Sequence, residues 1–184
     1  SNNLCSLLPG KDRLTLTARL DFDRSAILKK KTFFRSVITS KQRFTYDVVK
    51  KIIIDKDPKT RSAHKRFLTP LKWAAELATE LQTKRHTRGS VRFTIPEAKI
   101  SLNADESIKA ITRTESHFAH QMIEEFMLAA NEAVADTFSE AERTTLFRIH
   151  ETPDVDKVSE FIQFAATLGI TLPPSEEKHF WCNT

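Results

Sequence analysis

The sequence predicts an α+β fold, in which antiparallel strands pack with several helices and one long helix lies at the centre. The first observation is the strict alternation of apolar and polar residues over 13–22, which is typical of a half-buried strand. The second is an apolar pattern at three- and four-residue steps over about 115–138, which is typical of a long helix. The segments between them contain no internal repeat, so one domain accounts for the pattern.

The N-terminal segments predict a β-hairpin. From Arg13 to Phe22, Leu, Ala and Phe occupy every second position and Thr, Arg and Asp lie between them, so one face of this strand is expected to be buried. Residues 23–25 predict a short turn. Residues 27–38 predict the returning strand, because they are rich in Phe and β-branched side chains.

Two helices are predicted after the hairpin. Thr45 can cap a short helix that runs from Tyr46 to about Ile54. The charged stretch 55–69 contains a proline and is expected to be a long loop. Thr69 followed by Pro70 predicts the start of a second helix, with proline at its first position, that stops before Gly89.

The second half predicts further strands and helices. Short strands are expected around 91–95, 99–102 and 109–112, ahead of the long helix. Residues 146–150 predict another strand, and Thr152-Pro153 predicts the start of a final helix that ends at Gly169. The domain is therefore expected to cover residues 4–172, and residues 173–184 are expected to form a loose tail.

Composition narrows the class of protein. The chain has 184 residues, of which 40% are hydrophobic, so it can form one domain with its own core. Only 3 glycines occur, which argues against a glycine-rich phosphate loop, and no apolar run approaches the ~20 residues that span a membrane. Cys5 and Cys182 lie at opposite ends of the sequence, and this spacing suits neither a zinc site nor a disulfide framework. A reducing, cytoplasmic setting is the simplest expectation.

The charge is distributed unevenly along the chain. Residues 1–88 contain 21 Lys or Arg and 8 Asp or Glu, whereas residues 89–184 contain 8 and 16. The densest basic stretches are 29–31, 35–43 and 56–66. Such asymmetry favours a surface that faces a polyanion. The alternative is a set of lysines that are merely exposed to solvent.

The predicted central helix contains the longest motif. The segment from His117 to Ala135 places Glu124, Glu125 and Asn131 inside its apolar pattern. The sequence AHQMIEEFMLAANEAVA closely resembles the central helix of the RNB family, the exoribonucleases of the ribonuclease II and ribonuclease R type. Four other segments resemble family motifs and occur in family order, namely residues 4–10, 34–46, 88–97 and 147–154.

This resemblance implies part of an RNB catalytic domain. The implied activity is processive hydrolysis of single-stranded RNA from its 3′ end to nucleoside monophosphates, with Mg²⁺ in the full-length enzyme. The family's metal-binding aspartates and a clamping tyrosine would lie upstream of Leu4, and a phosphate-facing arginine would lie downstream. Ser1-Asn2-Asn3 resembles a cloning scar. We therefore expect an interior fragment that forms the wall of the RNA channel, binds no metal itself and is inactive alone.

The resemblance also assigns three RNA-binding residues. Tyr46 matches a tyrosine that contacts RNA, and Phe93 matches an aromatic residue that stacks on the 3′ nucleotide. Glu124 matches a glutamate that, with the tyrosine, discriminates ribose from deoxyribose, since a carboxylate accepts a hydrogen bond from a 2′-hydroxyl. The alternatives are a tyrosine that packs its ring and exposes its hydroxyl, a phenylalanine that packs in the core, and a glutamate that is exposed to solvent or paired with an arginine. Glu125 is expected to face elsewhere, because consecutive helical residues point in different directions.

Other chemistries have little support in the sequence. His117 and His120 are three residues apart, but no HExxH motif and no set of carboxylates or cysteines completes a zinc site. His150 is expected to pack or form hydrogen bonds, and no signature of a serine or cysteine triad is present. The rival hypothesis is a non-catalytic RNA-binding or scaffold module with an RNB-like fold. An unrelated α+β domain is a third possibility, against which five ordered motifs argue.

Overall fold

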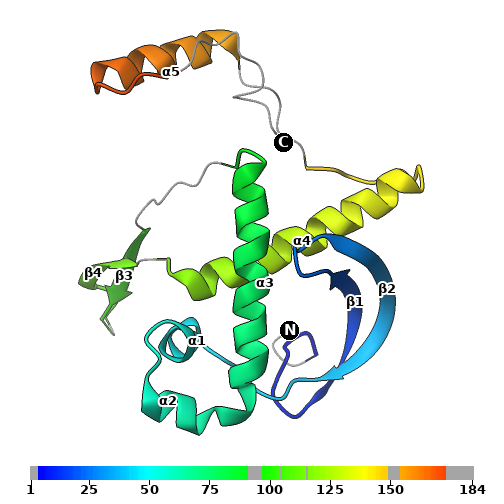
Figure 1. Cartoon of the computed structure of the whole chain (residues 1–184). Coiled ribbons are helices and arrows are strands. Elements are labelled where there is room, and N and C mark those ends of the chain that lie inside the picture. The colour runs from blue at the N-terminus through cyan, green and yellow to red at the C-terminus, as the bar shows by residue number, and fades with distance from the viewer. Residues whose placement is uncertain (1–3, 91–96, 104, 115, 149–153, 173–184) are drawn as a thin grey trace.

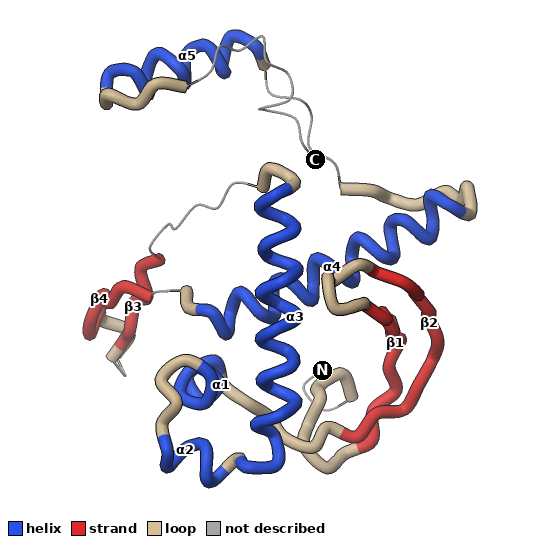
Figure 2. Tube along the Cα trace, viewed as in Figure 1, coloured by secondary structure: helices blue, strands red, loops and turns tan. Residues whose placement is uncertain are grey.

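The computed structural model describes residues 4–90, 97–103, 105–114, 116–148 and 154–172. It confirms the α+β class, with two two-stranded antiparallel sheets and several helices among these residues. The long helices α3 and α4 cross one another, and the larger hairpin curves along one side of α4 (Figure 1). The smaller sheet lies near the N-terminal end of α4 (Figure 2).

The larger sheet is the predicted hairpin. Strand β1 (Asp12–Phe22) pairs antiparallel with β2 (Leu28–Thr39), and the register shifts between Asp21 and Phe22. The predicted burial of the apolar face of β1 is wrong at Leu14 and Leu16, whose side chains are 87% and 80% exposed. The polar face is half-buried instead. There the hydroxyl of Ser36 lies 2.8 Å from that of Thr15 and 2.6 Å from that of Thr17.

The first helices differ from the prediction in one respect. Helix α1 (Tyr46–Ile53) begins as expected, with the Thr45 hydroxyl accepting a hydrogen bond from the Val48 amide. The predicted long loop is wrong, since this stretch contains helix α2 (Pro58–Ala63) and the 3₁₀ turn η1 (Lys65–Phe67). Helix α2 forms because the charged stretch contains a helix N-cap. Asp57 accepts from the Thr60 amide at 2.7 Å, and proline follows it at the first helical position.

Helix α3 (Leu68–Thr87) starts earlier than predicted. It follows directly from η1, its N-cap is Phe67, and Thr69 and Pro70 lie inside its first turn. Proline is tolerated there because its missing N–H is not needed for the helical ladder. The helix ends before Gly89, as predicted, where the glycine takes a φ of 98°.

The second half has one short sheet and two helices. Strands β3 (Glu97–Leu102) and β4 (Ile108–Thr114) pair antiparallel and confirm two of the three predicted short strands. The third, at 91–95, lies outside the described residues, as does the tail from 173 onwards. Helix α4 (Phe118–Glu140) is the predicted long helix. None of the described helices is long and apolar enough to cross a bilayer.

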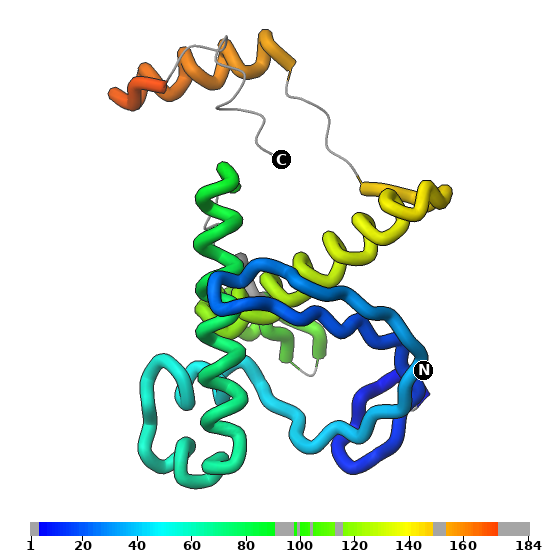
Figure 3. The backbone as a smooth tube through the Cα atoms, turned by 45° about the vertical axis from the view of Figure 1, so that its right-hand side comes forward, coloured from blue at the N-terminus to red at the C-terminus, as the bar shows by residue number. Residues whose placement is uncertain are grey.

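The C-terminal region corrects one expectation and confirms another. The described part of the predicted strand at 146–150 is not a strand, and Leu146 is fully exposed with no strand to pair with among the described residues. Helix α5 (Val155–Thr167) is present, and Asp154 caps it by accepting from the Asp156 amide at 2.8 Å. Gly169 lies just beyond its end with a φ of 76°. In both views α5 lies apart from the crossing of α3 and α4 (Figure 3).

The core forms where α1, α3 and α4 meet. Small side chains lie at the crossing, with Ala78 on α3 and Ala119 on α4 both almost fully buried. Small residues let the two backbones approach closely, and larger apolar side chains surround them. The buried members are Val49, Ala78, Ala119 and Met122, and the half-buried ones are Phe44, Ile53, Leu71, Ala74, Ala75, Phe118 and Phe126.

We predict that Ile52→Ala lowers the free energy of unfolding by about 2–5 kcal/mol, because this side chain is 0% exposed and its removal leaves a cavity. The measurement is urea unfolding followed by circular dichroism. The matched control is Ile111→Ala, whose side chain is 64% exposed, and its loss should be clearly smaller. Equal losses in the two variants would contradict the burial assigned to Ile52.

Candidate functional site

The site is built around Tyr46, the first residue of α1. The Thr45 cap fixes the start of this helix, and α1 packs against α4. The Tyr46 ring stacks on the ring of His120 on α4, with 3.9 Å between the ring centroids and 25° between the planes. The side chain remains 44% exposed. Tyr46 is therefore held by one neighbour and still open to a ligand.

A second histidine supports this stack. The rings of His117 and His120 meet edge to face at 4.3 Å, and the His117 amide donates to Nδ1 of His120 at 3.4 Å. Neither ring nitrogen of His117 has a hydrogen-bond partner in the described part of the structure. Its nearest acid is Asp47, whose Oδ1 lies 3.8 Å from Nε2. No group of three His, Cys, Asp or Glu that could hold a metal ion occurs among the described residues.

The Glu-Glu pair of α4 divides into a buried and an exposed member. Glu125 is 3% exposed and receives Arg85 from α3, with Nη2–Oε1 at 2.6 Å and Nε–Oε2 at 3.3 Å. The hydrogen bond to Glu125 raises the pKa of Arg85 above its ordinary value. Glu124 keeps 57% of its side chain exposed, and its Oε1 lies 3.7 Å from Arg85 Nη2. The pair thus supplies one structural carboxylate and one that can meet a ligand.

His120 links two of the three predicted residues. His120 and Glu124 are four residues apart on α4 and share a helix face, where such residues have Cβ atoms about 5–6 Å apart. Tyr46 stacks on His120, so Tyr46 and Glu124 neighbour the same histidine, one through a ring contact and the other along the helix. Phe93, the third predicted residue, lies outside the described residues.

The sequence did not predict the roles of two residues near the site, His120 and Arg85. His120 was considered only as a metal ligand, and nothing local to the sequence signals its stack with a residue 74 positions earlier. Arg85 could have been found. A glutamate between Met122 and Phe126 in an apolar stripe needs a cation, because carboxylates are almost never fully buried without a partner.

The basic stretches are not equivalent in the structure. Lys29 pairs with Asp23 at 3.0 Å, and Lys31 pairs with Glu140 at 2.8 Å, so two lysines of the 29–31 stretch are partly neutralised. The loop before Tyr46 is different. Phe44 packs its ring against those of His64 and Phe67, at 5.3 and 5.2 Å between centroids. This contact places the loop beside η1, and both segments carry exposed cations, namely Lys41, Arg43, Lys65 and Arg66.

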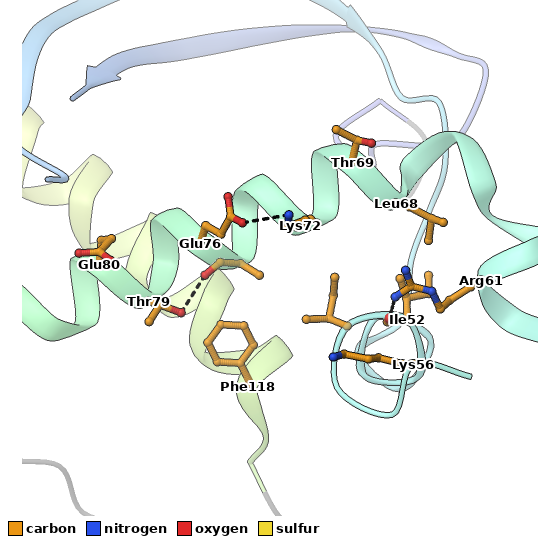
Figure 4. A pocket seen from close by; sticks show the side chains of 12 residues that line it. Ile52, Lys56, Arg61, Leu68, Thr69, Lys72, Glu76, Thr79, Glu80 and Phe118 are labelled. Atoms are coloured by element: carbon orange, nitrogen blue, oxygen red, sulfur yellow. Dashed lines mark hydrogen bonds and ion pairs between the residues drawn. The ribbon is translucent and has the colours of Figure 1, made fainter. Parts of the chain in front are cut away.

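A separate groove includes neither Tyr46 nor Glu124 among its lining residues. It has a volume of about 760 Å³ and runs between α1, α2 and α3, with Phe118 at one end (Figure 4). Arg61 reaches across it to donate to the Ile52 carbonyl at 3.0 Å, and Lys72 pairs with Glu76 at 3.5 Å. A second groove of about 530 Å³ contains Arg85 and Glu125.

Comparison with known proteins identifies the class. Residues 1–181 match the RNB domain, and the chain belongs to the RNB family. Among its relatives, Ribonuclease R of Aquifex aeolicus is 37% identical over 169 residues, which is 92% of this chain and 24% of that protein. Ribonuclease R of Escherichia coli is 34% identical over 173 residues, which is 94% of this chain and 21% of that protein. The chain thus spans about a quarter of the length of these relatives.

Solved structures agree with this assignment. Mycoplasma genitalium RNase R in complex with ribose methylated single-stranded RNA is similar with a TM-score of 0.85 and 29% identity, over 94% of this chain and 27% of that one. The same enzyme in complex with double-stranded RNA gives a TM-score of 0.85 and 27% identity, over 98% and 33%. The Dss1 exoribonuclease of Candida glabrata, at 17% identity and a TM-score of 0.66 over 94% and 23%, shares the fold.

We predict that Arg85→Ala lowers the free energy of unfolding by about 3–5 kcal/mol, because it leaves the Glu125 carboxylate buried and unpaired. Glu124→Ala removes only an exposed contact and should cost less than about 1 kcal/mol. Both are measured by urea unfolding. The double variant Arg85→Leu with Glu125→Leu should recover part of the loss. If Arg85→Ala and Glu124→Ala lower the free energy of unfolding equally, the Arg85–Glu125 ion pair is not buried in the folded chain.

A second prediction concerns pH. Burial lowers the pKa of His117 below its ordinary value, and the nearby His120 lowers it further, while Asp47 opposes the shift. The folded chain then binds fewer protons than the unfolded chain near pH 6. This contribution to the free energy of unfolding should be complete above about pH 6.5 and decline as the pH falls from there toward the folded pKa.

Urea unfolding between pH 5 and 8 measures this effect. His117→Asn, which cannot titrate, should give a flatter pH dependence than the parent, whereas His86→Gln, a change at an exposed histidine of α3, should keep the parent slope. An unchanged slope in His117→Asn would show that His117 does not titrate differently in the two states.

Proposed function

We propose that this chain is a segment of a longer RNB exoribonuclease that hydrolyses single-stranded RNA from its 3′ end to nucleoside monophosphates. Residues 4–172 would form part of the catalytic domain, and its exposed surfaces would line the RNA channel. The observation that supports this most is the stack of Tyr46 on His120, which shares a face of α4 with Glu124. The relatives' name, Ribonuclease R, and the complexes of RNase R with RNA point to the same substrate.

The role of this chain is binding rather than bond cleavage. Divalent ions would supply the charge neutralisation for phosphodiester hydrolysis, and Mg²⁺ is the ion we expect. The family resemblance implies that the carboxylates that would hold this ion lie in other parts of the full-length protein. Tyr46 and Glu124 would hold one ribose, with Glu124 accepting a hydrogen bond from the 2′-hydroxyl. Phe93 would stack on the terminal nucleotide.

The setting we propose is the reducing cytoplasm. Two cysteines at opposite ends of the sequence are typical of a chain that does not depend on disulfides.

We predict that this chain binds single-stranded RNA weakly and that its affinity falls as the salt concentration rises. The logarithm of the association constant should fall with the logarithm of the salt concentration, with a slope of about −0.7 for each phosphate neutralised. Lys41→Gln with Arg43→Gln should weaken binding and reduce the slope, because these cations are exposed beside Tyr46. Lys29→Gln with Lys31→Gln removes the same charge, but these lysines already face carboxylates and the effect should be smaller. Fluorescence anisotropy with labelled RNA from 50 to 300 mM salt measures both. If the two double variants weaken RNA binding equally, the RNA does not prefer the cations near Tyr46 and binds across the whole basic surface.

The second experiment uses the full-length protein, incubated with RNA and DNA oligomers and Mg²⁺ or Mn²⁺. Release of mononucleotides is expected from RNA, and this chain alone should release none. Glu124→Ala with Tyr46→Phe should narrow the gap between RNA and DNA rates, because a contact to a hydroxyl is worth about 1–3 kcal/mol. An unchanged RNA preference would refute the role of these residues. Absence of any nuclease activity in the full-length protein would favour a scaffold module instead.

A further inference from the structure

We propose that His120 is a positioning residue, which fixes the Tyr46 ring at a set distance from Glu124 so that both reach one ribose. This inference rests on the proposed function of Tyr46 and Glu124. It adds a third residue to the site, one that acts through the tyrosine and does not itself contact the nucleotide.

The stack with His120 restrains the Tyr46 ring. At 3.9 Å between centroids and 25° between planes, the His120 ring covers one face of the Tyr46 ring. Tyr46 is otherwise 44% exposed at the very start of a helix, where an unsupported side chain would sample several rotamers. The stack removes this freedom before a ligand binds. It leaves the hydroxyl, the edge and the other face of the tyrosine ring for a nucleotide.

The His120 ring is itself held in place by His117. Its ring meets that of His117 at 4.3 Å, and its Nδ1 accepts from the His117 amide at 3.4 Å. Both contacts come from the N-terminal end of α4, so the helix end sets the orientation of the His120 ring. A ring held by two contacts from His117 can transmit the position of α4 to Tyr46 on α1.

The spacing along α4 connects His120 to Glu124. Glu124 lies one turn beyond His120 on the same helix face, so the imidazole and the carboxylate belong to one rigid element. The position of Tyr46 relative to His120 therefore also determines its position relative to Glu124. Recognition of a hydroxyl requires its partners to be held within about 0.5 Å of their productive positions. Loss of the stack should reduce discrimination between the two sugars.

The first test reports on the tyrosine directly. Tyr46 is the single tyrosine of the 184 residues, so the chain labelled with 3-fluorotyrosine gives one protein resonance in ¹⁹F NMR. His120→Ala should move this resonance toward that of free fluorotyrosine, because the ring current of the stacked imidazole is lost. His120→Phe keeps an aromatic ring and should retain a displaced resonance. His86→Ala, on the surface of α3, should leave the parent resonance unchanged.

The second test measures kcat/KM for RNA and DNA oligomers in the full-length protein. His120→Ala should lower the ratio of RNA to DNA about as far as Tyr46→Phe does, by about tenfold or more. The double variant should lose little more than either single variant, since both changes disable one unit. His120→Phe should keep most of the ratio. Should alanine prevent folding, His120→Gln, which also lacks a ring, replaces it in both tests.

The outcomes separate the two proposals. If Tyr46→Phe lowers the ratio but His120→Ala keeps the parent value, His120 is not a positioning residue and the proposed function stands. If Tyr46→Phe and Glu124→Ala both keep the parent ratio, the sugar-reading role fails and the His120 proposal fails with it. An unshifted ¹⁹F resonance in folded His120→Ala overturns the stack itself.

Discussion

The ion pair between Arg85 and Glu125 joins α3 to α4 and satisfies a carboxylate that is almost fully buried on the helix that carries the candidate site. Both oxygens of a carboxylate that is 3% exposed are held by one guanidinium, which also donates to the Ser90 hydroxyl at 3.0 Å. A buried pair of this kind contributes little net stability compared with apolar side chains, but either partner alone is costly. The pair therefore selects one rotation of α4 about its axis. In that rotation Glu124, 100° further round the helix, faces outward beside His120.

Much of the fold followed from local rules. Alternation in 13–22 predicted β1, the Thr45 cap predicted the start of α1, and the apolar pattern predicted α4 to within three residues at either end. The errors are also local. Asp57-Pro58 is a helix start of the same type as those recognised elsewhere, but the surrounding charges obscured it. Leu146 lies in a segment with β-like composition, and a strand needs a pairing partner that local sequence cannot supply.

The exposed face of the hairpin has a different origin. Leu14 and Leu16 on β1 and Val37 on β2 share one face and are 87%, 80% and 61% exposed. A contiguous apolar face of this kind is unusual on a free surface and typical of an interface. The alternation predicted burial, but burial depends on what packs against a strand. Relatives four times as long as this chain contain polypeptide that could cover such a face.

The candidate site could be predicted only as separate residues. The family resemblance implies roles for Tyr46 and Glu124, but a motif says nothing about how two residues 78 positions apart are held together. In the structure, His120 links the two residues. Its ring stacks on Tyr46 of α1, and it lies on the same face of α4 as Glu124. A 2′-hydroxyl is a small difference between two polymers, and reading it needs fixed geometry rather than strong binding. In the proposed site, the stack of Tyr46 on His120 would provide that geometry at low entropic cost, because the helix ends that carry both rings pack against the core.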